Sequence, residues 1–441
     1  MSGHITLGEV HTLQHTVSVA PSARRLTGSL RDIGYSFESA VADLVDNSIT
    51  AGATQIDIQI IFSGRESFIR IIDDGSGMDG TGIDEAMRFG SDRNYSSGDL
   101  GRYGLGLKTA SISQCRRLEI VSMTRESETH EARTLDLDFI QDTDSWVVLD
   151  TRDEDETLEA RRLLRKGYGT VVTWRRLDRI LPHRNKESGW ARKRIENLVP
   201  KLDRHLSMVF HRFLSGERAE VLTITVNGEH LEPWDPFARE ETGTRCIGKD
   251  SFEVEHRHDS GIIMLSRYLL PPKSDFSTPE AFENASGPQK WAKQQGIYIY
   301  RADRLVQWGG WAGIRTSDEH TKLARASLDF DTDLDAAFNI NVAKMKVTIP
   351  HQIRKMLARP ITELCIEADH TYRKKTGEAP AVQSGVTPNL YSGSRGRSES
   401  AEILGTALRS AAVRTGNIDA LRSMIRLLRE ESPELAEQLG L

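Results

Sequence analysis

The sequence has few cysteines and no long apolar run, and both shortages exclude whole classes of protein. Its three cysteines, Cys115, Cys246 and Cys365, lie far apart, so neither disulfides nor a structural zinc site is expected. Its thirteen histidines include no H-x-x-x-H pair with a carboxylate between, which disfavours an all-protein catalytic metal site. No stretch approaches the roughly 20 apolar residues of a membrane span, and the first twenty residues lack the apolar run of a signal peptide. We therefore expect a cytoplasmic protein with no membrane partner.

The charge of the chain is unevenly distributed. The net charge is −6, yet residues 161–213 contain fifteen Lys and Arg against four Asp and Glu. Such runs are often solvated helix faces. A strip of this kind also suits a polyanion such as nucleic acid, and Arg192, Lys193 and Arg194 are its densest part. Charge alone leaves both interpretations open.

The spacing of apolar residues predicts an α+β fold. Apolar residues recur at helical spacing across 36–52, with Ser36 as N-cap and Gly52 as the stop. Two alternating runs at 55–62 and 68–73 flank a Ser-Gly-Arg-Glu turn and predict adjacent antiparallel strands. Further strand-like runs follow at 118–124, 132–139 and 170–174. We predict an antiparallel sheet with helices on one face, a two-layer sandwich.

A second α+β unit is predicted downstream of the first. A long helical segment at 191–214 precedes strand-like runs at 221–226, 297–300 and 342–349, and helical spacing returns at 353–372. The Gly-, Ser- and Pro-rich stretch from 377 to 399 is typical of a flexible linker, and short amphipathic helices follow it. The predicted division is an N-terminal arm (1–25), a first domain (26–185), a second domain (186–375), a linker (376–399) and a helical partner-binding tail (400–441).

The first pattern that carries chemistry is Asp43-Leu44-Val45-Asp46-Asn47. Asp43 and Asn47 are four residues apart, so we expect both on the polar face of the helix whose other face is core. A carboxylate and an amide there can orient a water and ligate Mg²⁺, which prefers oxygen ligands. An Asp and an Asn on a helix face are also commonly just solvated.

The second pattern, Asp73-Asp74-Gly75-Ser76-Gly77-Met78, follows directly after a predicted strand. The carboxylate of Asp73 can accept a hydrogen bond from a flat ligand, while the glycines let the backbone approach it. An ordinary Asp-Gly turn is the simpler alternative.

The third pattern is the glycine-rich stretch from Gly101 to Ala110, which contains Gly104, Gly106 and Lys108. The glycines precede a predicted helix at 107–115, whose free N–H groups can hold phosphates, and Lys108 adds a point charge. The glycine spacing matches neither a Rossmann fingerprint nor a Walker loop.

Taken together, the three patterns resemble the N, G1 and G2 boxes of the GHKL ATPases (gyrase, heat-shock chaperone, histidine kinase, MutL), with Gly169-Thr170 similar to a fourth box. The form of the glycine box, and the segments 210–237 and 297–311, resemble the MORC-like branch. The resemblance spans residues 30–350 and implies a Bergerat-fold ATPase domain followed by a transducer domain. It implies ATP and Mg²⁺ as ligands, with Asn47 holding Mg²⁺, Asp73 accepting from adenine and Thr170 supporting that contact. The other binding residues that it implies are Gly75, Gly77, Met78, Gly101, Gly104, Leu105, Gly106, Leu107 and Lys108.

The catalytic residues implied by the resemblance are Asp43 and Lys344. Asp43 stands where the family usually has a Glu that activates water; it is one methylene shorter but has the same acid–base chemistry. Asp46 is the fallback. Lys344 lies in a segment that resembles the one whose lysine reaches the γ-phosphate, and Lys346 has the same parity in a strand, so periodicity does not choose between them.

The resemblance implies a slow ATPase that acts as an ATP-gated homodimeric clamp in DNA transactions or anti-phage defence, beside a nuclease or helicase bound through the tail. Two alternatives stay open. One is a nucleotide sensor that does not hydrolyse ATP, and the other is a scaffold whose function resides in its tail.

Overall fold

The computed structural model describes residues 21–32, 34–90, 106–164, 166–182, 185–217, 220–256, 259–340, 347–376 and 425–426. The chain divides into two compact units, Met1–Glu378 and Ala379–Leu441, and the fold below is that of the first. Across these described ranges, no helix is both long and apolar enough to traverse a bilayer.

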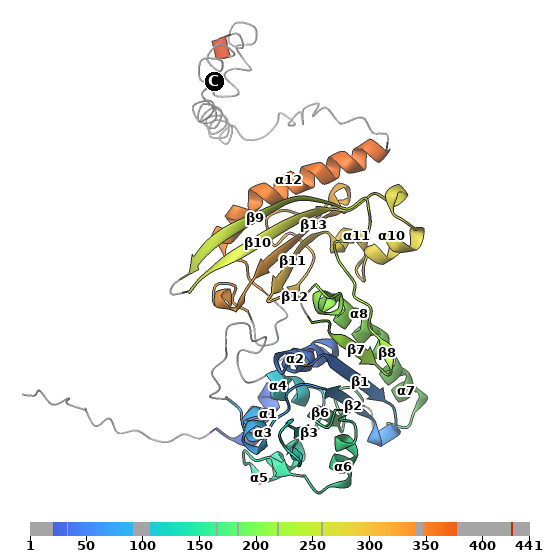
Figure 1. Ribbon diagram of the computed structural model, residues 1–441, viewed down its shortest axis with the longest axis vertical. Helices are drawn as coiled ribbons and strands as arrows, with labels where there is room; N and C mark the ends of the chain where they lie inside the picture. The colour runs from blue at the N-terminus through green and yellow to red at the C-terminus, as the bar shows by residue number, and fades with distance from the viewer. Residues whose placement is uncertain are drawn as a thin grey trace, which may run out of the picture. The chain divides into compact units, whose positions relative to one another are not determined.

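The first unit contains an eight-stranded sheet in the order β5-β4-β3-β6-β2-β1-β7-β8 (Figure 1). Neighbouring strands are antiparallel except for β1 and β7, which run parallel. The predicted hairpin is confirmed, since Ile56 of β1 pairs with Asp73 of β2. The strands are β1 (Gln55–Ile61), β2 (Phe68–Asp73), β3 (Arg117–Met123), β4 (Glu131–Asp136), β5 (Leu149–Asp150), β6 (Gly169–Arg175), β7 (Thr223–Val226) and β8 (Glu229–His230).

Helices cover one face of this sheet and part of the other, in an α+β arrangement that confirms the predicted fold class. The Ser36 hydroxyl caps α2 by accepting from the amide of Ser39, as the sequence predicted. Residues of α2 share the main core with alternate residues of the strands, such as Ile71 and Val172. On the opposite face, Ala160 of α6 packs in a separate cluster with Val171. The helices here are α1 (Ala23–Arg31), α2 (Phe37–Thr50), α3 (Gly80–Met87), α4 (Gly106–Ile112), α5 (Leu137–Thr143) and α6 (Asp155–Arg161).

The first sheet continues beyond residue 185, the boundary that the sequence predicts between the two domains. The long helix predicted at 191–214 is three helices, α7 (Gly189–Glu196), α8 (Val199–Val209) and α9 (His211–Leu214). Their apolar side chains pack in the main core, and β7 extends the sheet by pairing with β1. Local periodicity identifies the elements but carries no information on which sheet they join. Residues 189–231 therefore pack on the first sheet or extend it.

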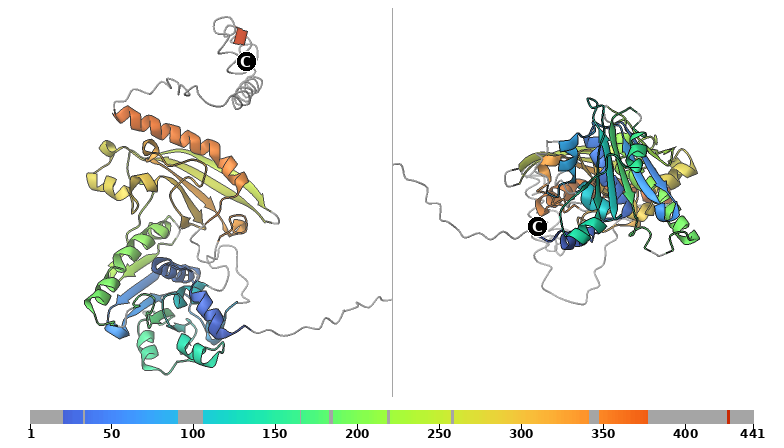
Figure 2. Two further views of the ribbon diagram at one scale, coloured as in Figure 1. Left: turned by 180° about the vertical axis from the view of Figure 1, so that it is seen from behind. Right: turned by 90° about the horizontal axis from the view of Figure 1, so that it is seen from below.

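A second, five-stranded sheet has the order β12-β11-β13-β10-β9. The helix α12 lies along one face of this second sheet (Figure 2). There Ile353, Leu357 and Ile361 are buried in a core that is separate from the core of the first sheet. This sheet contacts α9 through polar bonds, one of them between His211 Nε2 and Tyr300 Oη at 2.8 Å, and Met208 of α8 packs with Tyr298 and Tyr300. Its elements are β9 (Arg245–His256), β10 (Asp259–Leu269), α10 (Pro279–Ala285), α11 (Lys290–Gln294), β11 (Gly296–Arg301), β12 (Arg304–Gln307), β13 (Ala324–Phe330) and α12 (His351–Thr376).

The strand predicted at 297–300 is confirmed as part of β11, whereas the one predicted at 342–349 is not found in its described part, residues 347–349. Val347 and Ile349 are buried in the second core, which explains their apolar character. The amide of Val347 donates to the side chain of Gln307, and Pro350 follows directly, so the backbone here does not join a ladder.

Candidate functional site

Residues 43–47 of α2 include two carboxylates and one amide, and they differ in exposure. Asp43 and Asp46 are 2% and 0% exposed, whereas Asn47 is exposed. Asp43 is therefore not simply solvated, the alternative that the sequence left open. The tyrosine before the helix and an arginine from the second sheet cover that side, and neither contact is visible in helical periodicity.

Asp43 lies between Tyr35, Arg304 and the start of α4. Tyr35 donates its phenol hydrogen to Asp43 Oδ2 at 2.9 Å, and Asp43 Oδ1 lies 3.8 Å from an Arg304 nitrogen. Burial and the neighbouring charge of Asp43 raise the pKa of Tyr35 well above its usual value, so the phenol remains a donor. A Cβ atom placed on Gly106 would be 3.5 Å from Asp43 Oδ2. The carboxylate therefore adjoins the first described residue of the glycine-rich stretch.

Asp73 ends β2 as a buried carboxylate held by neutral donors. Its Oδ2 accepts from the Ser48 hydroxyl at 2.8 Å, and its Oδ1 accepts from the Gly75 amide at 3.0 Å. Burial raises the pKa of Asp73 to about 6, although the bonds from Ser48, Gly75 and the Thr170 backbone oppose the rise. A carboxylate has about four lone-pair positions, so Asp73 retains capacity to accept from a ligand.

Thr170 lies beside Asp73 and belongs to a chain of hydroxyl contacts. It is the register partner of Asp73 across β2 and β6. Its hydroxyl oxygen is 2.9 Å from that of Ser122, and Ser122 Oγ accepts from the Met78 amide at 2.8 Å. These bonds tie the half-buried Met78 to Thr170 through Ser122.

The glycines after Asp73 are required by the protein's own packing. Gly77 has φ +71°, and a Cβ there would lie 2.0 Å from the carbonyl oxygen of Met123. A Cβ on Gly75 would lie 2.9 Å from the Cβ of Ala51. The sequence predicts that these glycines let the backbone approach a ligand, but in the structure they let it approach β3 and the end of α2.

Lys108 is directed away from solvent. It is 1% exposed, and its Nζ donates to the carbonyl oxygens of Ala86, at 2.9 Å, and Arg88. Burial lowers its pKa to about 8. Lys108 thus holds the C-terminal end of α3 in this structure. Of its neighbours, Leu107 is half-buried, while Gly101, Gly104 and Leu105 lie outside the described residues, as do Lys344 and Lys346.

The basic strip is neutralised in part. Arg175, Arg176 and Arg179 form ion pairs with Glu119, Asp136 and Asp32 at 2.9, 3.1 and 2.5 Å. Arg192, Lys193 and Arg194 on α7 are exposed. Among them, the guanidinium of Arg192 lies 5.1 Å from the ring centre of Phe62, and that of Arg194 lies 5.4 Å from that of Trp190. Part of the strip is thus paired with carboxylates, and its exposed cations include the three on α7.

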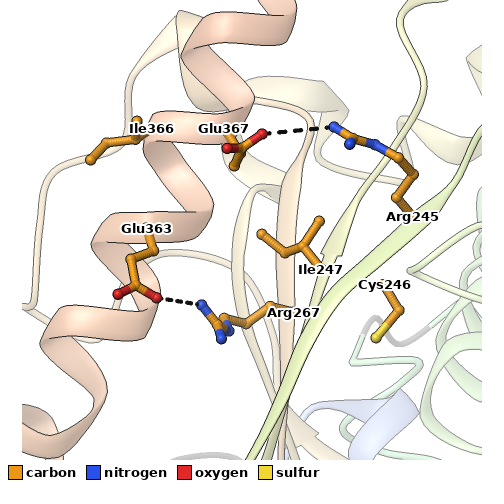
Figure 3. Close-up of a pocket in the computed structure, with 7 residues that line it drawn as sticks. All are labelled: Arg245, Cys246, Ile247, Arg267, Glu363, Ile366 and Glu367. Carbon is orange, nitrogen blue, oxygen red and sulfur yellow. Dashed lines mark hydrogen bonds and ion pairs between the residues drawn. The ribbon is translucent and has the colours of Figure 1, made fainter.

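A groove of about 570 Å³ lies elsewhere, between β9, β10 and α12 (Figure 3). Its two arginines are paired, with 3.0 Å between Arg267 and Glu363 and 3.9 Å between Arg245 and Glu367. Because these charges cancel, the groove is not favourable for an anion such as a nucleotide phosphate.

Sequence reasoning did not assign a role to Tyr35, Ser48, Ser122 or Arg304. Ser48 directly follows Asn47, and this position next to the polar pattern on α2 could have indicated a role for it. Arg304 lies in a segment that resembles the MORC-like branch, but nothing in its neighbours indicates a partner 258 residues away. Such contacts depend on how the two sheets meet.

Comparisons with known proteins agree with this geometry. The family profile described as "Histidine kinase-, DNA gyrase B-, and HSP90-like ATPase" matches residues 35–170, which include Asp43, Asn47, Asp73 and Thr170. "ATPase morc-1" of Caenorhabditis elegans is 37% identical over 84 residues, 19% of this chain and 10% of that protein. "DNA mismatch repair protein MutL" of Leuconostoc citreum (strain KM20) is 56% identical over 41 residues, 9% of this chain and 6% of that protein. "ATPase MORC2" of Homo sapiens is 38% identical over 81 residues, 17% and 8% of the two chains.

These matches are local, since the chain spans a tenth or less of the length of the relatives named here. The family profile covers strands β1 to β5 of the first sheet and the polar residues at the end of β2. Residues 35–170 therefore form a domain of the histidine kinase-, DNA gyrase B- and HSP90-like ATPase family, similar to the MORC ATPases and to MutL.

Proposed function

We propose that this chain binds ATP at the ends of the central strands β2 and β6 of the first sheet, with the adenine against Asp73. The supporting observation is a buried carboxylate held by Ser48 and Gly75 and not by a cation among the described residues. Such a group accepts well from an exocyclic amine, because the amine completes its hydrogen bonding without disrupting an ion pair. Thr170 and Met78, joined through Ser122, form the adjoining wall.

In this proposal the phosphates lie near the glycine-rich stretch that ends at Gly106 and Leu107. The exposed amide of Asn47 is the side chain that would hold Mg²⁺ together with phosphate oxygens and water, the donor set this ion prefers. Bound Mg²⁺ would neutralise charge that develops on the phosphates. No group of three His, Cys, Asp or Glu suited to a metal occurs in the described ranges, so the phosphates would supply the remaining affinity.

The reaction we propose is slow hydrolysis of ATP to ADP and phosphate, with Asp43 as general base. Asp43 takes a proton from the attacking water while the oxygen of that water bonds to the γ-phosphorus and the bond to ADP breaks. The proton then returns to solvent. Tyr35 orients the carboxylate by donating to Oδ2.

The test is the variant Asp43→Asn, which keeps the shape of the side chain and removes its basicity. We expect turnover to fall about 10²- to 10⁴-fold while nucleotide affinity is retained. Asp57→Asn is the matched control, because Asp57 accepts a bond from Thr225 at 2.6 Å and lies outside the proposed site. A variant at Asp43 that hydrolyses ATP at the parental rate would place the base elsewhere.

A second candidate is a nucleotide sensor that does not hydrolyse ATP. The observation that favours it is the enclosure of Asp43, a short carboxylate that is 2% exposed and already accepts from Tyr35. Turnover of the parental protein separates the two. Binding without release of phosphate would support the sensor.

We further propose that ATP binding drives homodimerisation through the first domain, with residues 1–25 as an arm across the dimer and a clamp as the result. Support comes from the similarity to a protein named for DNA mismatch repair and to MORC ATPases. By the same kinship, the cellular role is a DNA transaction or anti-phage defence. The test is molar mass by light scattering with and without a non-hydrolysable ATP analogue. A monomer in both conditions would exclude the clamp.

For the tail beyond residue 399 we propose docking of a partner, a nuclease or a helicase. Its amphipathic pattern is too short to form a core alone and follows a flexible composition. Deleting residues 400–441 should leave ATP binding intact and abolish capture of that partner. Loss of folding on deletion would show that the tail packs on the rest of the chain.

A further inference from the structure

The hairpin of β11 and β12 brings an arginine to the nucleotide-binding helix. Its turn residues Ala302 and Asp303 have φ of 46° and 67°, as in two-residue type I′ turns. This turn makes Arg301 and Arg304 the last register pair of the hairpin. Arg301 binds Asp335, which follows β13 in the chain, whereas Arg304 extends to α2.

Arg304 contacts two carboxylates of α2, Asp46 and Asp43. Its Nε donates to Asp46 Oδ1 at 2.8 Å, and its terminal nitrogen lies 3.8 Å from Asp43 Oδ1. All three side chains are buried, and Arg304 is 3% exposed. The guanidinium also lies 5.8 Å from the ring centre of Phe210 in the segment joining α8 and α9. The cation of Arg304, which comes from the second sheet, is thus held by groups of α2 and of the segment between α8 and α9, which pack with the first sheet.

The energetics of buried charge make this contact a coupling between the sheets. Moving the hairpin away from α2 would take the cation from two buried carboxylates, and removing one partner of a buried pair is strongly unfavourable. Asp43 has one oxygen bonded to Tyr35 and the other facing Arg304, so the two neighbours together restrict its rotation. A displacement of reacting groups by about 1 Å can cost about a hundredfold in rate.

We propose that Arg304 is a positioning residue for ATP hydrolysis, which fixes the orientation of Asp43 and so makes turnover depend on the docking of the second sheet against α2. This inference rests on the proposed hydrolysis at Asp43. It assigns Arg304 no contact with ATP, and so it predicts an effect on kcat and not on nucleotide affinity.

The decisive variant pairs Arg304→Gln with Asp46→Asn, so that both charges of the buried ion pair are removed together. Asp43 is kept. We expect parental nucleotide affinity by calorimetry, a thermal midpoint near the parental one, and a kcat about a hundredfold lower. Arg304→Lys, which keeps the charge, should retain more turnover than Arg304→Gln alone.

The matched control is Arg301→Gln with Asp335→Asn, which removes the equally buried pair on the same hairpin. It should leave kcat at the parental value. Parental turnover in the Arg304 and Asp46 double variant would overturn the inference, as would an equal loss in the control. A parental protein that binds ATP without hydrolysing it would instead overturn the proposed hydrolysis, and this inference with it.

Discussion

The two sheets of the first compact unit both bury charged side chains, but they satisfy them differently. In the second sheet, Arg301 binds Asp335 through bonds of 2.6 and 2.7 Å, and Arg325 donates to backbone carbonyls. In the first sheet, Asp73 is held by a hydroxyl and backbone amides, and burial raises its pKa to about 6. A charge paired within the fold stabilises that fold, whereas a buried carboxylate bound only by neutral donors keeps capacity for a ligand.

The largest expected effect is on the stability of the second sheet. Arg301→Gln removes the guanidinium that donates to both oxygens of Asp335, a carboxylate that is 3% exposed. We expect the free energy of unfolding to fall by about 3–5 kcal/mol in chemical denaturation. Adding Asp335→Asn should recover much of this loss. A single variant within about 1 kcal/mol of the parent would contradict the assigned role of this pair.

The corresponding change in the first sheet, Asp73→Asn, should affect binding and not stability. Loss of the charged acceptor should weaken nucleotide affinity about 10- to 100-fold, measured by calorimetry with a non-hydrolysable analogue. Stability at about pH 7.5 should be unchanged or increased, because burial makes the ionised form of Asp73 unfavourable. Undiminished affinity would show that Asp73 does not face the nucleotide.

The pH dependence of stability and of nucleotide affinity tests the role of Asp73 further. The pKa of Asp73 is raised from 3.8 to about 6 in the folded protein, so the folded state binds this proton more tightly than the unfolded state does. Its contribution to stability is therefore greatest below about pH 4 and is lost as the pH rises through about 6. Nucleotide affinity should change in the opposite direction and fall below about pH 6, by at most about tenfold per pH unit. In Asp73→Asn only the titration of the phosphates should remain, and equal pH curves in both proteins would contradict this prediction.

Sequence reasoning was most successful where the determinants are local. The cap at Ser36, the hairpin after α2 and the place of Asp73 at the end of β2 each follow from a few neighbouring residues. The cover over Asp43 could not be predicted, because Tyr35 precedes α2 and Arg304 comes from the second sheet. Helical periodicity gives the faces of a helix but not what packs against them, so the burial of Asp43 could not be predicted either.

The smallest effect is expected on the basic strip, where paired and exposed cations can be compared. Charge reversal of Arg192, Lys193 and Arg194 should flatten the salt dependence of DNA retention, by up to about 0.9 in log–log slope for each phosphate that the variant no longer neutralises. Arg179→Gln, which removes a cation already paired with Asp32, is the control and should leave the slope unchanged. No retention at low salt in the parental protein would leave α7 as a solvated helix.

The parallel pairing of β1 with β7 has a consequence for how the chain folds during synthesis. Gln55 and Thr223 are partners in this pairing, so the interior of the first sheet is completed only after some 170 further residues have emerged. Until then β1 is an edge strand whose alternate residues Ile56, Ile58 and Ile60 lack part of their cover, and such edges promote aggregation. A chain ended at residue 185 would keep this edge permanently, whereas one extended past Leu231 would close it.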